Sequence, residues 1–246
     1  TRALDDREPG RAAGGLAALV GDLAAWYAPR RPGAGRELVE PLTLLLAPFV
    51  PHLSEAIHRQ AGSRPRSSVH LQDWPTLDPA WEDAALLSNM ARVRHLVELG
   101  LRARVQAGIE SDQLLPGVLV GSLAGASWEL ADLHPFARLL ADALRVTQVK
   151  FSPDAAGYVG WRLALNPERP VQRDVPQAAI EAALADLSAG EAAHLAAQLR
   201  TGMSVGLEVS GLAITLLPDE VCISAQARSG SVAVADAEHL VILAVG

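Results

Sequence analysis

Cysteine and lysine are almost absent from this 246-residue sequence, which contains one of each, Cys222 and Lys150. A single cysteine excludes an intramolecular disulfide framework and a cysteine-rich zinc site. Long apolar runs are also missing, since none approaches the roughly 20 residues of a membrane-spanning helix. The chain begins Thr-Arg-Ala-Leu, which is not a signal peptide. We therefore expect a cytoplasmic protein that has no membrane partner.

Charge is unevenly distributed along the chain. The formal net charge is −7, which argues against a generally basic nucleic-acid-binding protein. Up to Arg104, however, 13 arginines face 12 acidic residues, whereas from Val105 onward 8 basic residues face 16 acidic ones. Any contact with a polyanion is therefore expected in the first half.

The hydrophobic pattern changes near residue 108. Before it, helical spacing predicts a helix from Arg11 to Ala28 that Pro29 ends, and further helices follow. These are expected at 36–47, from a restart near Pro51, and at 81–107. After it, the pattern predicts strands at 117–123, 147–152 and 158–165 and helices at 134–144, 176–187 and 189–200. Hairpin strands are predicted at 204–209, 212–217 and 220–227. Two further strands, 229–235 and 239–245, are expected to complete the layer that these hairpin strands form. The predicted fold class is α+β: an N-terminal α-helical bundle (1–107), then a small α/β C-terminal domain with antiparallel hairpins (108–246).

Catalytic signatures are missing from the sequence. There is no glycine-rich phosphate loop, no G-x-S-x-G, no H-E-x-x-H and no C-x-x-C. His52 and His58 lie about one and a half helical turns apart, so they do not share a face that could hold a metal. We therefore expect no catalytic residue, no metal site and no cofactor in this chain.

The predicted helix at 81–107 carries arginines at regular spacing. Arg94, Glu98 and Arg102 lie at i, i+4 and i+8, which fits either a surface ion-pair ladder or an arginine face on phosphates. Gly100 costs a helix about 1 kcal/mol relative to alanine, which indicates close packing against another element.

Five stretches, in this order, carry a family resemblance: "DLAAWYAPRR" (22–31), "LLLAPFVPHLSEAIHRQ" (44–60), "SVHLQDWP" (68–75), "MARVRHLVELGLRAR" (90–104) and "LADALRVTQVKF" (140–151). Together they resemble the C-terminal region of isoleucyl-tRNA synthetase, a class I aminoacyl-tRNA synthetase. The third stretch is the most specific, and the likeness extends weakly through the terminal hairpins.

This resemblance implies an anticodon-binding bundle whose partner is tRNA, in particular tRNA-Ile. The residues that it places on tRNA are Trp26, Arg30, Arg31, Arg92, Arg94, Arg102 and Arg104. The family's HIGH and KMSKS motifs are absent here. The resemblance therefore implies that ATP-dependent aminoacylation, with its ATP and Mg²⁺, belongs to catalytic domains outside this sequence, so enzyme activity of the chain itself stays open.

Two departures from the family pattern leave an alternative. "PGAG" (32–35) follows Arg31 where the family has more arginines and aromatics, and "IESDQLLP" (109–116) places Glu110 and Asp112 where the family is basic. Anions beside a phosphate surface reverse a favourable interaction. The alternative is a stand-alone, synthetase-derived paralogue that acts as a structural or protein-interaction module without tRNA binding.

The adjacent aromatics Trp26 and Tyr27 have two possible roles. They point about 100° apart on a helix, so we expect one to pack in the bundle and the other to lie at its rim. A stacking platform for an unpaired base is the alternative for the pair. Arg30 and Arg31 follow Pro29 and are expected to be exposed.

Overall fold

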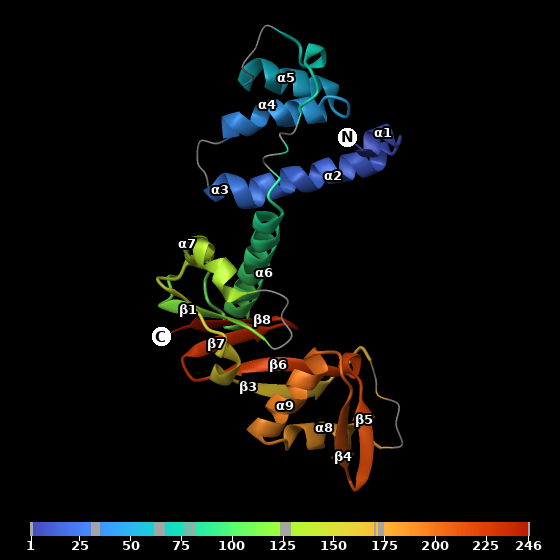
Figure 1. Cartoon of the computed structure of the whole chain (residues 1–246), viewed down its shortest axis with the longest axis vertical. Helices are drawn as coiled ribbons and strands as arrows, with labels where there is room; N and C mark the ends of the chain where they lie inside the picture. Colours follow the sequence, from blue (N-terminus) through green and yellow to red (C-terminus); the bar gives the residue numbers. More distant parts are fainter. Residues whose placement is uncertain are drawn as a thin grey trace. The chain divides into compact units, whose positions relative to one another are not determined.

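The computed structural model describes residues 2–30, 35–61, 67–76, 79, 82–123, 129–169, 171 and 175–245. The chain forms two compact units, Thr1–Glu82 and Asp83–Gly246, whose elements are labelled in Figure 1. Helices make up the regular structure described in the first unit, and the second unit combines helices with antiparallel and parallel strand pairs. The predicted α+β fold class is confirmed.

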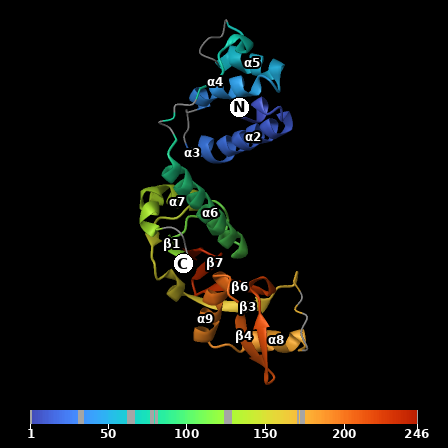
Figure 2. The same ribbon diagram turned by 45° about the vertical axis from the view of Figure 1, so that its right-hand side comes forward.

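The first unit is helical in its described part. Its elements are α1 (Arg2–Asp5), α2 (Pro9–Asp22), a π-helical turn (Leu23–Tyr27), α3 (Ala28–Arg30), α4 (Gly35–Leu46), α5 (Pro51–Ala61) and a 3₁₀ turn (Val69–Leu71). Helices α4 and α5 pack side by side (Figures 1 and 2). Helix α5 begins at Pro51, as predicted, because a proline in the first turn loses no intrahelical hydrogen bond.

The first helix continues through Pro29, although the sequence predicted that Pro29 ends it. Between α2 and α3 the N–H of Ala28 bonds to the carbonyl of Leu23, five residues back. This wider turn accommodates a proline, which has no N–H and whose ring crowds the preceding turn of an α-helix. No residue of α2 or of the π-helical turn is buried, so the predicted apolar stripe is half-buried or exposed.

The second unit starts with a long helix and a four-stranded sheet. Helix α6 (Ala84–Gln106) begins at Asp83, whose carboxylate accepts a hydrogen bond from the N–H of Leu86. The sheet has the order β2-β1-β8-β7, with β1 parallel to β2 and antiparallel to β8. Its strands are β1 (Gly117–Ser122), β2 (Val149–Phe151), β7 (Ser231–Ala235) and β8 (His239–Ala244).

Helix α6 buries one face against this sheet and against α7 (Ala137–Leu144), which follows a 3₁₀ helix (Leu130–Phe136). Leu96, Leu99 and Ala103 are fully buried. A Cβ at Gly100 would lie 2.4 Å from a methyl carbon of Leu144, so the close packing expected of this glycine is confirmed. Because α6 belongs to the core of the second unit, the units divide between residues 82 and 83, whereas the sequence placed its boundary between 107 and 108.

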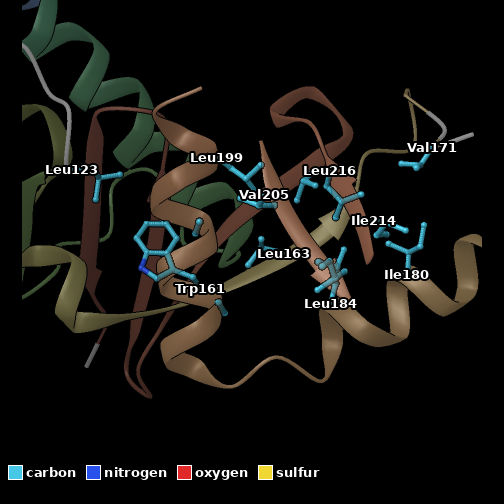
Figure 3. Packing of buried hydrophobic residues seen from close by; sticks show 14 of the residues in the cluster. Leu123, Trp161, Leu163, Val171, Ile180, Leu184, Leu199, Val205, Ile214 and Leu216 are labelled. Atoms are coloured by element: carbon cyan, nitrogen blue, oxygen red, sulfur yellow. The ribbon is translucent and has the colours of Figure 1, made fainter. Parts of the chain in front are cut away.

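The rest of the second unit consists of two strand pairs and two helices, whose hydrophobic core (Figure 3) is continuous with Ala233, Leu240 and Ile242 of the four-stranded sheet. Its elements are a 3₁₀ turn (Ala155–Tyr158), β3 (Val159–Leu165), α8 (Gln177–Ala185), α9 (Ala189–Arg200), β4 (Val205–Val209), β5 (Leu212–Leu216), a 3₁₀ turn (Pro218–Glu220) and β6 (Val221–Ala227). Strand β3 pairs with β6 and β4 with β5, and their inward side chains, such as Trp161 and Leu163, pack with Ile180, Leu184 and Leu199 from the helices.

Strands β7 and β8 do not join β4–β6 in one layer, although the sequence predicted that they complete it. They pair instead with β1. The succession of hairpins along the chain does not fix which sheet a hairpin joins. Here β8 is buried along most of its length and lies between β1 and β7, with which it pairs on its two edges. Among the helices that the structure describes, none is long and apolar enough to cross a membrane.

We expect Gly121→Ala to destabilise the second unit. A Cβ at Gly121 in β1 would lie 2.1 Å from the Cβ of Ala155 and 3.2 Å from the carbonyl oxygen of Ser152, so backbone must move. Overpacking of this kind costs about 1–3 kcal/mol, which urea denaturation followed by circular dichroism would measure.

Gly206→Ala is the matched control, because Gly206 also lies in a strand and a Cβ there meets nothing within 4 Å. We expect no loss of unfolding free energy in this variant. Equal unfolding midpoints for the two variants would contradict the close contact at Gly121.

Candidate nucleic-acid interface

Trp26 and Arg30 form a stacked pair in the first unit. The guanidinium carbon of Arg30 lies 3.7 Å from the centre of the Trp26 ring, and its Nη1 donates a hydrogen bond of 2.8 Å to the Trp26 carbonyl. Trp26 and Tyr27 are both half-buried. Arg30 is exposed, as the sequence predicted. A stacked guanidinium is held in place by the ring, so it presents its charge with little further loss of side-chain freedom. Arg31, the neighbouring predicted contact, lies outside the described residues.

Glu55 of α5 holds the "SVHLQDWP" segment in the first unit. Its Oε2 accepts hydrogen bonds from the Ser68 hydroxyl at 2.9 Å and the Val69 N–H at 2.8 Å, and its Oε1 accepts one from Arg59. Val69 is buried in this arrangement, while Leu71 remains 81% exposed. Two of the stretches that carry the family resemblance are therefore joined by one carboxylate.

The same contacts lower the pKa of Glu55 from 4.5 to about 2. The hydrogen bond from Val69 is the largest cause, burial opposes it, and Arg59 and Ser68 add to the lowering. A carboxylate whose pKa is lowered by folding stabilises the folded state above its unfolded pKa. This contribution is complete above about pH 4.5 and is lost as the pH falls toward 2.

We expect Glu55→Gln to lower the thermal unfolding midpoint at neutral pH, because the amide carries no charge for the Val69 N–H and Arg59. The difference in unfolding midpoint between the variant and the wild type, measured by circular dichroism, should narrow as the pH falls from 4.5 toward 2. Glu8→Gln is the control, since the exposed Glu8 makes a local ion pair with Arg11, three residues away. A pH-independent difference at Glu55 would show that its charge is unimportant.

In the second unit, α6 carries the arginines predicted to contact tRNA. At about 100° per residue, Arg102 lies about 80° from Arg94 on one side and about 80° from Arg92 on the other, so Arg92 and Arg94 are about 160° apart. Arg92 donates to Ser88 and Asn89 on its own helix, Arg94 is half-buried, and Arg102 is exposed. Arg102 can therefore face one phosphate chain together with Arg94 or with Arg92, whereas Arg92 and Arg94 point to opposite sides of the helix.

Arg104 does not have the exposure that an RNA contact requires, which corrects the prediction made for it. Its side chain is 2% exposed, and the guanidinium donates to backbone carbonyls of Leu144, Arg145, Glu110 and Gln113 at 2.7–3.1 Å. Burial, and secondarily the nearby Arg145, lower the pKa of Arg104. This arginine joins the end of α6 to the end of α7 and to the loop that precedes β1.

We expect Arg104→Met to destabilise the second unit by about 3 kcal/mol, because several buried carbonyls lose a charged donor. Arg102→Met, two residues away and exposed, should change stability by no more than about 0.5 kcal/mol. Urea denaturation of both variants measures the difference. Equal stabilities would show that the carbonyls find other donors.

A pocket of about 310 Å³ opens beside the four-stranded sheet, and no motif in the sequence predicted it. Val118 and Ile242 of the sheet contribute apolar surface, while Lys150, Tyr158 and Arg228 stand around it. These three side chains are exposed. An exposed aromatic ring and two cations in a pocket with apolar lining suit an unpaired base and its phosphate. Because the three residues come from three separate segments, no spacing in the sequence connects them.

Comparison with known proteins shows which family this chain is similar to. Residues 1–119 match the family model described as the anticodon-binding domain of tRNA ligase. This range covers the first unit, α6 and the start of β1.

Curated relatives extend the similarity to nearly the whole chain. Isoleucine–tRNA ligase of Thermus thermophilus is 33% identical over 94% of this chain and 24% of its own length. The corresponding ligases of Streptomyces avermitilis and Thermobifida fusca are 31% and 32% identical, over 94% and 98% of this chain and 23% and 24% of their lengths. The chain thus spans about a quarter of the relatives it matches, and the resemblance drawn from the five sequence stretches is confirmed.

Proposed function

We propose that this chain, a relative of the isoleucine–tRNA ligases, is the portion of such a ligase that binds tRNA and recognises the anticodon of tRNA-Ile. The match of residues 1–119 to the anticodon-binding domain of tRNA ligase carries this proposal. Aminoacylation with ATP and Mg²⁺ would take place in catalytic domains outside this sequence, in the cytoplasm.

Exposed and half-buried cations supply the physical basis for RNA binding. Contacts with phosphates are local, so an acidic protein can bind RNA where a few guanidinium groups face the backbone. Arg94 and Arg102 would contact phosphates from one side of α6. The Trp26–Arg30 pair would contact a base or a phosphate in the first unit.

The sheet pocket offers a further contact of the same kind in the second unit. Tyr158, which is 52% exposed, would stack on an unpaired base, and Lys150 and Arg228 would contact its phosphate. Glu110 and Asp112 are both exposed after α6. Because their negative charges repel phosphates, the phosphate chain would pass at a distance from them.

We expect the chain to bind a tRNA-Ile transcript with an affinity that falls linearly on a log–log plot against salt concentration. Arg94→Ala combined with Arg102→Ala should weaken binding and make the slope shallower by about 1 for each phosphate that is no longer neutralised. Lys150→Ala combined with Arg228→Ala tests the pocket in the same way. Filter binding across a salt series would provide these values.

Arg162→Ala is the control, because Arg162 is exposed on β3, outside the proposed contacts. It should leave affinity and slope within the scatter of the wild type. Absence of binding at about 50 mM salt, where phosphate contacts are strong, would refute tRNA binding for a chain that circular dichroism shows to be folded. The same result would favour a protein-interaction module, the alternative that the acidic net charge supports.

A further inference from the structure

Three potential metal ligands from distant parts of the sequence meet in the second unit. His95 lies on α6, Asp236 follows β7, and His239 begins β8. The ligand atoms that they offer all lie within 4.8 Å of one another. The cluster is partly open to solvent, since the side chains of His95, Asp236 and His239 are 37%, 31% and 12% exposed.

One oxygen of Asp236 is fixed by the turn between β7 and β8. Its Oδ1 accepts hydrogen bonds from the N–H groups of Glu238 at 2.8 Å and His239 at 2.7 Å. Its Oδ2 contacts Nε2 of His95 and lies 3.2 Å from Nδ1 of His239. The backbone therefore orients the carboxylate so that one oxygen faces both imidazole rings.

The same contacts lower the pKa of Asp236. Burial raises its pKa, but hydrogen bonds from His239, His95 and the turn N–H groups outweigh burial, so the pKa lies far below its ordinary value.

The ligand types match a particular class of ion. Two imidazole nitrogens and one carboxylate oxygen form the three-ligand set of many zinc sites, with water or another group at a fourth position. Bond lengths of about 2.0–2.1 Å place tetrahedral ligand atoms about 3.3 Å apart, close to the separation of Oδ2 from Nδ1 of His239. Nε2 of His95 lies closer to Oδ2 than this, so these two atoms would move apart to admit an ion. Glu98 lies 3.8 Å from Nδ1 of His95, the side of that ring opposite the carboxylate, where it can orient the imidazole.

We propose that His95, Asp236 and His239 bind a divalent transition-metal ion of the Zn²⁺ type. The ion would join the turn between β7 and β8 to α6 and so stabilise the packing of this helix on the sheet. The sequence predicted no metal site because that prediction considered only histidines that are close together along the chain. His95 and His239 are brought together by the packing of α6 on β7 and β8.

A hydrogen-bonded bridge without metal is the competing account of the same contacts. Both accounts predict that loss of Asp236 destabilises the turn, so stability alone does not separate them. Direct measurement of metal binding does, and it does not depend on whether the chain binds tRNA.

We would titrate Zn²⁺ by calorimetry, and Co²⁺ by its visible absorption, into the untagged chain after treatment with a chelator. We expect one equivalent to bind and the ion to raise the thermal unfolding midpoint. His95→Gln, His239→Gln and Asp236→Asn should each weaken binding by at least about tenfold, the smallest effect typical of perturbing a metal site.

His194→Gln is the control, because His194 is exposed on α9 and should leave the affinity unchanged. Circular dichroism in chelator shows whether each variant is folded, and Asp236→Asn retains an oxygen that can accept the turn N–H bonds. The proposal fails if the wild type binds no stoichiometric Zn²⁺, or if folded ligand variants bind it as tightly as the wild type.

Discussion

The burial of one face of α6 is the constraint on which the second unit depends. Leu96, Leu99 and Ala103 on that face are fully buried. Gly100 has no side chain, so α7 approaches closely enough for Leu144 to lie where a Cβ of residue 100 would be. With this face fixed, the rotation of the helix is fixed too. Every other side chain of α6 then has a determined direction: Arg104 inward to the carbonyls at the end of α7, His95 to the turn between β7 and β8, and Arg102 to solvent.

Arg102 and Arg104 show how this constraint separates chemically identical residues. They are two positions apart, so they point about 160° from each other. One is exposed and available for a phosphate in the proposed RNA contact, and the other is 2% exposed and bonded to backbone carbonyls. An arginine in a stretch that carries a family resemblance therefore has no fixed role until its helix is packed. The RNA surface of an acidic protein can then be small and still effective, because phosphate contacts act over short distances at physiological salt.

Two carboxylates hold connecting segments in the same way, by accepting hydrogen bonds from backbone N–H groups. Glu55 accepts the Val69 N–H and fixes the segment after α5, and Asp236 accepts the N–H groups of Glu238 and His239 and fixes the turn before β8. A carboxylate that accepts hydrogen bonds is favoured in its charged form, and both have lowered pKa values. The Val69 N–H is the largest cause for Glu55, whereas for Asp236 burial opposes the lowering and the side chains of His239 and His95 contribute more than the backbone N–H groups. In the first unit this contact joins two family stretches. In the second it orients the oxygen that faces His95 and His239.

Sequence by itself determined the order of the elements, the α+β class and the family, because helical and strand periodicities and five ordered stretches are local properties of the chain. It also indicated the close packing at Gly100, since a glycine in a helix has a cost that packing must offset. It did not determine the path through Pro29, which a π-helical turn accommodates, or the sheet that β7 and β8 join. Nor did it reveal that Arg104 is buried, that Lys150, Tyr158 and Arg228 surround one pocket, or that His95 meets Asp236. Apart from the turn at Pro29, which is local, those features depend on contacts between residues far apart in the sequence, and only the pairing of strands and the packing of α6 decided them.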